Sequence, residues 1–152
     1  MFGDDLLKGL TKAKHFRAKR CSSFDRSGRN ADCVVVRPGE RHTMAAIEGA
    51  GCIAHIWVTH SSADVHYRRK VVLRMWWDGE KHPSVECPLG DFFGVGHAVQ
   101  AAHSSLPFTT TANPNRPGGA MNCWFQMPYR TAARIEVENA AEADLAFYYY
   151  VD

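Results

Sequence analysis

Val71-Val72-Leu73-Arg74-Met75-Trp76-Trp77 runs directly into the turn residues Asp78-Gly79, and this stretch decides the fold class. β-Branched, aliphatic and aromatic residues fill it almost without interruption, which is typical of a buried strand. An Asp-Gly pair after such a run favours a tight turn into a second, antiparallel strand. The stretch therefore predicts one strand of an antiparallel sheet, with Trp76 and Trp77 on opposite faces.

Seven further short runs of the same kind surround this strand and are separated by Gly, Pro and other turn residues. They cover residues 33–36, 42–48, 52–59, 84–87, 121–127, 133–138 and 145–151. About eight short strands with this punctuation predict an all-β fold, an antiparallel β-sandwich of the jelly-roll type. Helix is expected only as a short N-terminal helix and as one turn near residues 89–93, and residues 100–120 are expected to form a long loop.

The chain is expected to form one domain. Its 152 residues suffice to bury most of the apolar surface without a disulfide or a metal. Residues 1–20 are dense in Lys and Arg and are predicted to form a basic helix or arm, whereas residues 21–152 form the jelly-roll domain. Such an arm could bind an acidic partner, but a solvated helix face explains the pattern more simply.

Charge and hydropathy exclude several classes of function. A net charge of +2 does not indicate a nucleic-acid partner, and the absence of any apolar run of about eighteen residues excludes a membrane helix. The N-terminus lacks the apolar core of a secretory signal. The chain as written is therefore expected to be cytoplasmic, with an export signal lost from a fragment as the alternative.

The cysteines and histidines predict no metal site. The five cysteines lie far apart without a C-x-x-C pair, and we expect buried free thiols in a reducing compartment. The eight histidines show no metal-ligand spacing such as H-E-x-x-H. We therefore expect neither a metal nor another cofactor.

One predicted strand contains two glutamates that could form a carboxylate pair. In Arg134-Ile135-Glu136-Val137-Glu138, the two glutamates share a face and lie roughly 7 Å apart along the strand. That separation resembles a glycosidase pair, yet alternating charges also mark the solvent face of any sandwich strand. The solvent face is the interpretation that we favour.

Four segments taken together resemble glycoside hydrolase family 172, also called domain of unknown function 2961. They are Ser22-Ser23-Phe24-Asp25-Arg26-Ser27-Gly28-Arg29-Asn30-Ala31-Asp32, Ile47-Glu48-Gly49-Ala50-Gly51-Cys52-Ile53-Ala54-His55-Ile56-Trp57, residues 73–94 with Asp91-Phe92-Phe93-Gly94, and Asn122-Cys123-Trp124-Phe125-Gln126-Met127-Pro128-Tyr129. Their order and spacing are similar to the N-terminal half of the family from about residue 16 onward. The resemblance implies the first of two tandem jelly rolls.

The resemblance also implies an activity and a partner. Family members act on furanosides by a retaining mechanism with two glutamates, and they assemble as trimers or higher oligomers. The resemblance places those glutamates in the second jelly roll, whereas this sequence stops where the first would finish. We therefore expect a furanoside-containing carbohydrate and a homo-oligomer as partners, and we assign no catalytic residue to this chain.

Eight residues are candidate substrate-binding residues. They are Asp25, Arg26, Asn30, Asp32, His55, Trp57, Asp91 and His97. The first four could bind sugar hydroxyls, or they could cap and pair within a structural loop, and the sequence leaves both open. His55 and Trp57 share a strand face and could form a sugar-stacking shelf, but core packing of Trp57 is favoured. Asp91 and His97 flank Phe92 and Phe93, which are expected to pack in the core, at a subunit contact or against a ligand.

The sequence and the family resemblance leave three functions open. The first is a domain that supplies sugar-binding residues to a furanosidase site completed elsewhere. The second is a structural jelly roll related to capsid-like assemblies, and the third is a carbohydrate-binding sandwich without catalysis. The polar residues of the segment 22–32 and of the loop around His97 favour sugar handling.

Overall fold

The computed structural model describes residues 12, 13, 15–112 and 118–152. The basic helix or arm predicted for residues 1–20 falls largely outside these residues. Its described part, residues 12, 13 and 15–20, has bends and irregular backbone. No helix of the described chain has both the length and the apolar character that crossing a membrane requires.

One layer of the fold is a seven-stranded antiparallel sheet. Its strands are β1 (Cys21–Ser22), β2 (Val34–Val36), β5 (Ile56–Ser62), β8 (His103–Ser104), β9 (Phe108–Thr110), β10 (Ala120–Cys123) and β13 (Leu145–Val151). The order is β1-β13-β5-β10-β9-β8, and β2 also pairs with β13. The long β13 therefore lies between β5 on one side and the two short strands β1 and β2 on the other.

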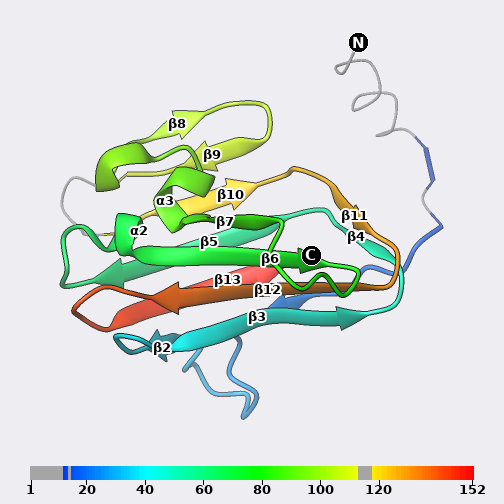
Figure 1. Ribbon diagram of the computed structural model, residues 1–152, viewed down its shortest axis with the longest axis horizontal. Helices are drawn as coiled ribbons and strands as arrows, with labels where there is room; N and C mark the ends of the chain where they lie inside the picture. The colour runs from blue at the N-terminus through cyan, green and yellow to red at the C-terminus, as the bar shows by residue number, and fades with distance from the viewer. Residues whose placement is uncertain (1–11, 14, 113–117) are drawn as a thin grey trace.

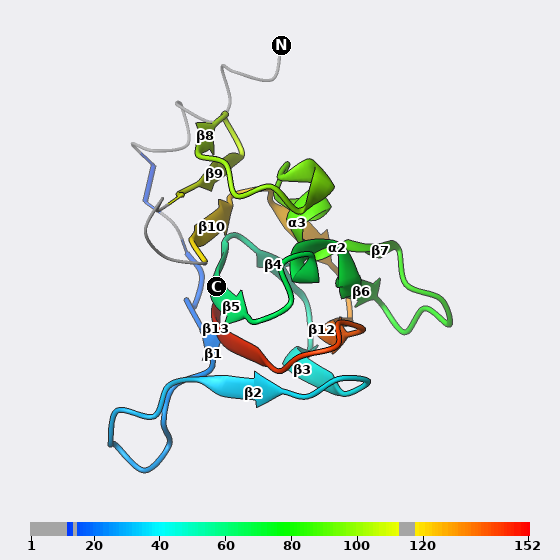
Figure 2. The ribbon, with the colours of Figure 1, turned by 90° about the vertical axis from the view of Figure 1, so that its left-hand side faces the viewer.

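The second layer is a four-stranded antiparallel sheet. It contains β3 (Arg41–Glu48), β12 (Ala132–Asn139), β6 (Val71–Trp77) and β7 (Val85–Pro88), in the order β3-β12-β6-β7. A two-stranded sheet of β4 (Gly51–Ile53) and β11 (Met127–Tyr129) closes one end. Figure 2 shows the two layers facing each other. The orders β2-β13-β5-β10 and β3-β12-β6-β7 are those of a jelly roll, which confirms the predicted fold class.

The short helical elements gather at one end of the sandwich. They are α2 (Tyr67–Lys70), α3 (Leu89–Phe92) and the 3₁₀ turn η1 (Gly96–Ala98). The turn expected near residues 89–93 is present as α3, but α2 was not expected, because four residues carry no helical periodicity. The expectation of a long loop over residues 100–120 is wrong in part, since β8 and β9 form there.

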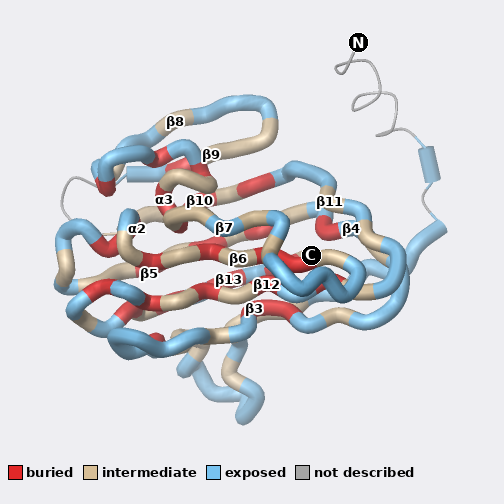
Figure 3. Tube along the Cα trace, viewed as in Figure 1, coloured by how far each residue is buried: buried red, intermediate tan, exposed pale blue. Residues whose placement is uncertain are grey.

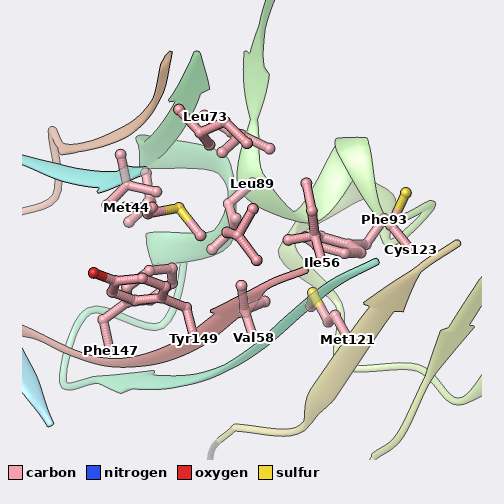
Figure 4. Close-up of a cluster of buried hydrophobic side chains, with 14 of the residues drawn as sticks. Met44, Ile56, Val58, Leu73, Leu89, Phe93, Met121, Cys123, Phe147 and Tyr149 are labelled. Carbon is pink, nitrogen blue, oxygen red and sulfur yellow. The ribbon is translucent and has the colours of Figure 1, made fainter. Parts of the chain in front are cut away.

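The core lies between the two sheets and follows the alternation of each strand. Val71, Leu73 and Met75 of β6 face Phe147 and Tyr149 of β13 across the sandwich, and all five are at most 5% exposed. Figure 4 shows part of this core, with Leu73, Phe147 and Tyr149 labelled, and Figure 3 shows buried residues alternating with less buried ones along the strands. Burial of these large side chains, at about 2–3 kcal/mol each, is the main force that holds the layers together.

The cysteines differ in part from expectation. All five are free thiols, but only Cys123 is buried, whereas Cys52 is exposed. Cys52 lies in the small strand β4, where the alternation places the buried Ile53 toward the core instead.

Candidate functional site

The eight candidate residues lie in three separate parts of the structure. Asp25, Arg26, Asn30 and Asp32 lie in the β1–β2 loop. His55 directly precedes β5 and Trp57 lies within it, whereas Asp91 and His97 lie in α3 and η1. Figure 1 shows the β1–β2 loop projecting from one edge of the sandwich, with α3 at the opposite edge. The fold therefore does not gather them into one pocket.

The carboxylates of the β1–β2 loop hold the loop itself in shape. Asp25 accepts hydrogen bonds from the Ser27 hydroxyl at 2.6 Å, the Ser27 N–H at 2.9 Å and the Ala31 N–H at 3.2 Å. The Asp25 N–H donates to Asp32 Oδ1 at 2.8 Å. The bond from the Ser27 hydroxyl is the main reason why the pKa of Asp25 is lowered. These contacts support the structural interpretation of both residues, and their sugar contact stays a prediction.

The other side chains of this loop point to solvent. Asn30 is exposed, and the Arg26 guanidinium lies 5.5 Å from the centre of the Phe24 ring. Arg29 donates from Nε to the Ser27 hydroxyl at 3.2 Å. Nothing in this loop encloses a ligand, so the loop offers exposed side chains and not a closed site.

Substitution of Asp25 with alanine is expected to loosen the β1–β2 loop. The change removes at once three accepted hydrogen bonds that hold the backbone of the loop. We expect trypsin to cut after Arg26 or Arg29 several times faster than in the unsubstituted chain, as followed by mass spectrometry. Asp144→Ala is the control, since Asp144 is exposed at the far end of β13. Equal cleavage rates for the two variants would contradict the role of Asp25.

Trp57 lies on the outer face of the seven-stranded sheet and not in the core as we expected. Its strand neighbours Ile56 and Val58 fill the core, and the alternation of β5 therefore turns the indole outward. Trp57 stacks with Tyr150 of the adjacent strand, with ring centres 4.7 Å apart. The Arg20 guanidinium lies 4.4 Å from the centre of the Tyr150 ring. The result is a ladder of stacked groups across the sheet.

A second group on this face is the His55 cluster, which we define as Arg20, His55, Thr109, Asn122, Trp124 and Asp152. His55 Nδ1 lies 3.2 Å from Asp152 Oδ2, and its Nε2 lies 3.1 Å from Asn122 Oδ1. Asn122 donates to the Thr109 hydroxyl at 3.2 Å, which fixes the orientation of its amide. Both nitrogens of the imidazole therefore face oxygen atoms, and the ring is held in one position.

Arg20 and Trp124 complete the His55 cluster. Arg20 donates to both oxygens of Asp152, from Nε at 2.6 Å and from Nη2 at 3.0 Å, and this bond is the main reason why the pKa of Asp152 is lowered. The Trp124 ring stacks on His55 with centres 5.3 Å apart, while the residue keeps 43% of its surface exposed. Trp124 thus presents an exposed indole beside a fixed set of polar groups.

The sequence contained only part of the signal for this face. Arg20 and Asp152 were missed, because they lie 132 positions apart in sequence and no local motif joins them. A signal was present in β13, where Tyr148 and Tyr150 alternate with buried Phe147 and Tyr149 and are still 38% and 37% exposed. Such a strand has aromatic residues on both faces, which is unusual for an outer face that meets only solvent.

The outer face of the four-stranded sheet has the opposite character. Arg74 bonds to Glu86 at 2.6 Å and to Glu138 at 2.5 Å, and Arg41 bonds to Glu138 at 2.8 Å. The bond from Arg74 is the main reason why the pKa of Glu138 is lowered. Glu136 lies 3.5 Å from Arg134. Glu136 and Glu138 therefore form ion pairs on the outer face of the sheet. This agrees with the solvent-face interpretation that we favoured from the sequence.

The third location is the contact between α2, α3 and η1. Asp91 forms an ion pair with Arg69 through Oδ2. Phe93 is buried, and Phe92 packs edge-on against it and against Phe108, so both rings pack inward. His97 is exposed on a left-handed backbone with φ of 58°. Asp91 and His97 therefore lie near each other in the chain but do not share a site with His55.

The outer face of the seven-stranded sheet also has a shallow hollow. It is lined by Val35, Ser61, Ser62, Ala63, Asp144 and Ala146. Within the part of the chain that the structure describes, no three His, Cys, Asp or Glu side chains are grouped to hold a metal ion.

Comparison with known sequences identifies a family that matches most of the chain. The family described as GH172 domain-like matches residues 28–147. The matched range includes His55, Asn122 and Trp124 and reaches from the β1–β2 loop into β13, so that it covers strands of both main sheets. No curated protein matches the chain.

Proposed function

Since the chain belongs to the GH172 domain-like family, we propose that it is a jelly-roll domain of a furanosidase-type glycoside hydrolase. In this proposal the domain supplies sugar-binding and subunit-contact residues. The carboxylates that cleave the glycosidic bond come from a second jelly roll. The observation that carries the proposal is the exposed Trp124 indole, held by His55 beside fixed polar groups.

An exposed indole with neighbouring hydrogen-bonding groups suits a carbohydrate. Sugars bind through apolar contact of their C–H faces with an aromatic ring and through a few placed polar groups. Thr109 accepts from Asn122 and keeps its own O–H to donate, and Arg20 is about half exposed with further N–H groups. These groups belong to the His55 cluster together with Trp124, and in this proposal a ring that stacks on the indole meets them with its hydroxyls.

In this proposal the carboxylates of the described chain serve binding and not cleavage. A retaining glycosidase needs a nucleophile and an acid/base about 5 Å apart. Asp25 is bonded within its loop, whereas Glu86, Asp91 and Asp152 are bonded to arginines. The Arg20 bond lowers the pKa of Asp152, so this carboxylate is a poor general acid near neutral pH.

The second candidate function is assembly without sugar binding. Trp57, Tyr148 and Tyr150 on the outer sheet face also suit a contact with another jelly roll, because aromatic residues are enriched in interfaces. In the furanosidase proposal the same rings contribute to subunit contacts in a trimer or a larger homo-oligomer. Binding of a furanoside by the chain distinguishes the two functions.

We expect the 152-residue chain to bind a furanoside and not to cleave it. Methyl α-L-arabinofuranoside should shift the indole N–H signal of Trp124 in a nitrogen-15 NMR titration, whereas methyl α-D-glucopyranoside should not. The aryl α-L-arabinofuranoside and an aryl fructofuranoside should release no phenol above background. Equal shifts with the pyranoside would contradict furanoside specificity, and no shift with either sugar would favour the assembly function. Hydrolysis by the chain alone would show that we placed the cleaving carboxylates in the wrong domain.

A further inference from the structure

A strip of outward-facing side chains, which we call the β5–β13 strip, extends from the His55 cluster along these two strands. Every second residue of each strand faces outward there, because the residues between them are buried in the core. Six positions separate His55 from Ser61, which corresponds to about 20 Å of strand. The strip is therefore much longer than a single sugar ring. Its paired residues are, in order from the His55 cluster, Trp57 with Tyr150, Thr59 with Tyr148, and Ser61 with Ala146.

The shallow hollow of this sheet face lies at the far end of the β5–β13 strip. Its volume is about 450 Å³, which is within the range of sites for small ligands. Ser61 and Ala146 line it together with Val35 of β2, which pairs with Ala146. Ser62 Oγ accepts from the Asp64 N–H at 3.3 Å and keeps its own O–H to donate. The hollow thus combines apolar side chains with hydroxyl groups.

Two tyrosine rings lie along the strip between the His55 cluster and the hollow. Tyr148 and Tyr150 are 38% and 37% exposed. Trp57 and the Arg20 guanidinium both stack on the Tyr150 ring, so this ring offers a ligand mainly its edge and its hydroxyl. Tyrosine hydroxyls donate and accept hydrogen bonds, and the ring edges add apolar contact. These rings therefore suit a ligand that carries hydroxyl groups along its length.

The charges of the strip favour a neutral ligand. At one end Arg20 and Asp152 form an ion pair with each other, and at the other end Asp144 lines the hollow. A phosphate or carboxylate in the hollow would face the like charge of Asp144. Between the two ends the side chains are neutral: Trp57, Thr59, Ser61, Ala146, Tyr148 and Tyr150. A neutral chain of sugar units matches this distribution of charge.

We propose that the β5–β13 strip binds a neutral oligosaccharide of furanosyl units, with one unit at Trp124 and another in the hollow. The class of ligand rests on the proposed function, whereas the second position rests on the hollow and on the register of β5 and β13. A single furanoside reaches only one of the two positions. An oligosaccharide binds more tightly, because its second contact is made within a complex that already exists.

The test compares ligand lengths by isothermal titration into the full chain. Methyl α-L-arabinofuranoside is the short ligand, and a linear arabinofuranosyl pentasaccharide is the long one. We expect the pentasaccharide to bind at least about tenfold more tightly, with one ligand per chain. Ala146→Gln should remove this gain, because the longer side chain fills the hollow, and should change the affinity for the methyl furanoside less than about twofold. Ala46→Gln, the same change at an exposed position of β3 in the other sheet, should leave both affinities unchanged.

The outcomes separate the strip from the proposed function. Equal affinities for the two ligands would overturn the strip and leave the proposed function intact, whereas no binding of either ligand would overturn both. A gain that survives Ala146→Gln would show that the further units do not bind in the hollow. A dimer in sedimentation that Ala146→Gln disperses and the pentasaccharide does not would assign the hollow to a second copy of the chain. If Ala146→Gln does not fold, Ala63→Gln blocks the hollow from an exposed position.

Discussion

Lowering the pH from 7 to 4 is expected to remove about 3 kcal/mol of stability through one buried histidine, His60 of β5. His60 is 3% exposed, and its Nδ1 lies 2.7 Å from the Tyr67 hydroxyl. Burial, and next the charge of Arg68, lower the pKa of His60 from 6.5 to about 3. The folded state therefore keeps the ring neutral while the unfolded chain takes up a proton. The stabilisation is complete above pH 6.5 and is lost as the pH falls from 6.5 toward about 3.

Substitution of His60 with asparagine should remove most of this pH dependence. The amide retains a polar group near the Tyr67 hydroxyl but does not titrate. We expect the variant to be less stable at pH 7 by about 1–3 kcal/mol, because a smaller side chain leaves a cavity. The two proteins should converge in stability near pH 4, as measured by urea unfolding at a series of pH values.

The control for this experiment is His82→Asn in the exposed turn after β6. It should follow the unsubstituted chain at every pH. Parallel curves for His60→Asn and the unsubstituted chain would show that the buried ring does not govern acid unfolding.

Substitution of Trp124 with alanine is expected to weaken furanoside binding by roughly thirtyfold, or about 2 kcal/mol. Under the proposed function, the indole supplies the apolar platform, and no other ring stacks on His55 in the described chain. The change should hardly affect folding, because the side chain is 43% exposed and projects from the end of β10. Isothermal titration with methyl α-L-arabinofuranoside measures the affinity.

Phe125→Ala is the matched control for Trp124→Ala. Phe125 is the next residue, is 54% exposed and packs on Phe108 with ring centres 5.6 Å apart. The variant removes a neighbouring exposed aromatic ring, which packs on Phe108 and does not stack on His55. We expect less than about a twofold change in affinity for this variant. An equal loss for both variants would indicate a general effect on the surface and not a platform at Trp124.

Several elements could be predicted from the sequence because their causes are local. The runs at residues 71–77 and 145–151 coincide with β6 and β13, since each is a continuous stretch of strand-forming residues between turn residues. The fold class follows from the number and spacing of such runs. The family resemblance followed from motifs that lie in order along the chain. The helix α2 and the strands β8 and β9 escaped prediction because two to four residues give no usable periodicity.

Tertiary structure alone decided which side chains of the candidate site meet. Alternation shows that Trp57 and Ile56 point to opposite faces, but only the packing of the second sheet shows which face is the core. Likewise, Arg20, His55 and Asp152 come together because β1, β13 and β5 are neighbours in the sheet, at a register that no local pattern contains. Hydrogen bonds require atoms within about 3 Å, and strand order sets such distances between residues far apart in the sequence. The sequence therefore determined the strands and the family, whereas the pairing of those strands determined the His55 cluster.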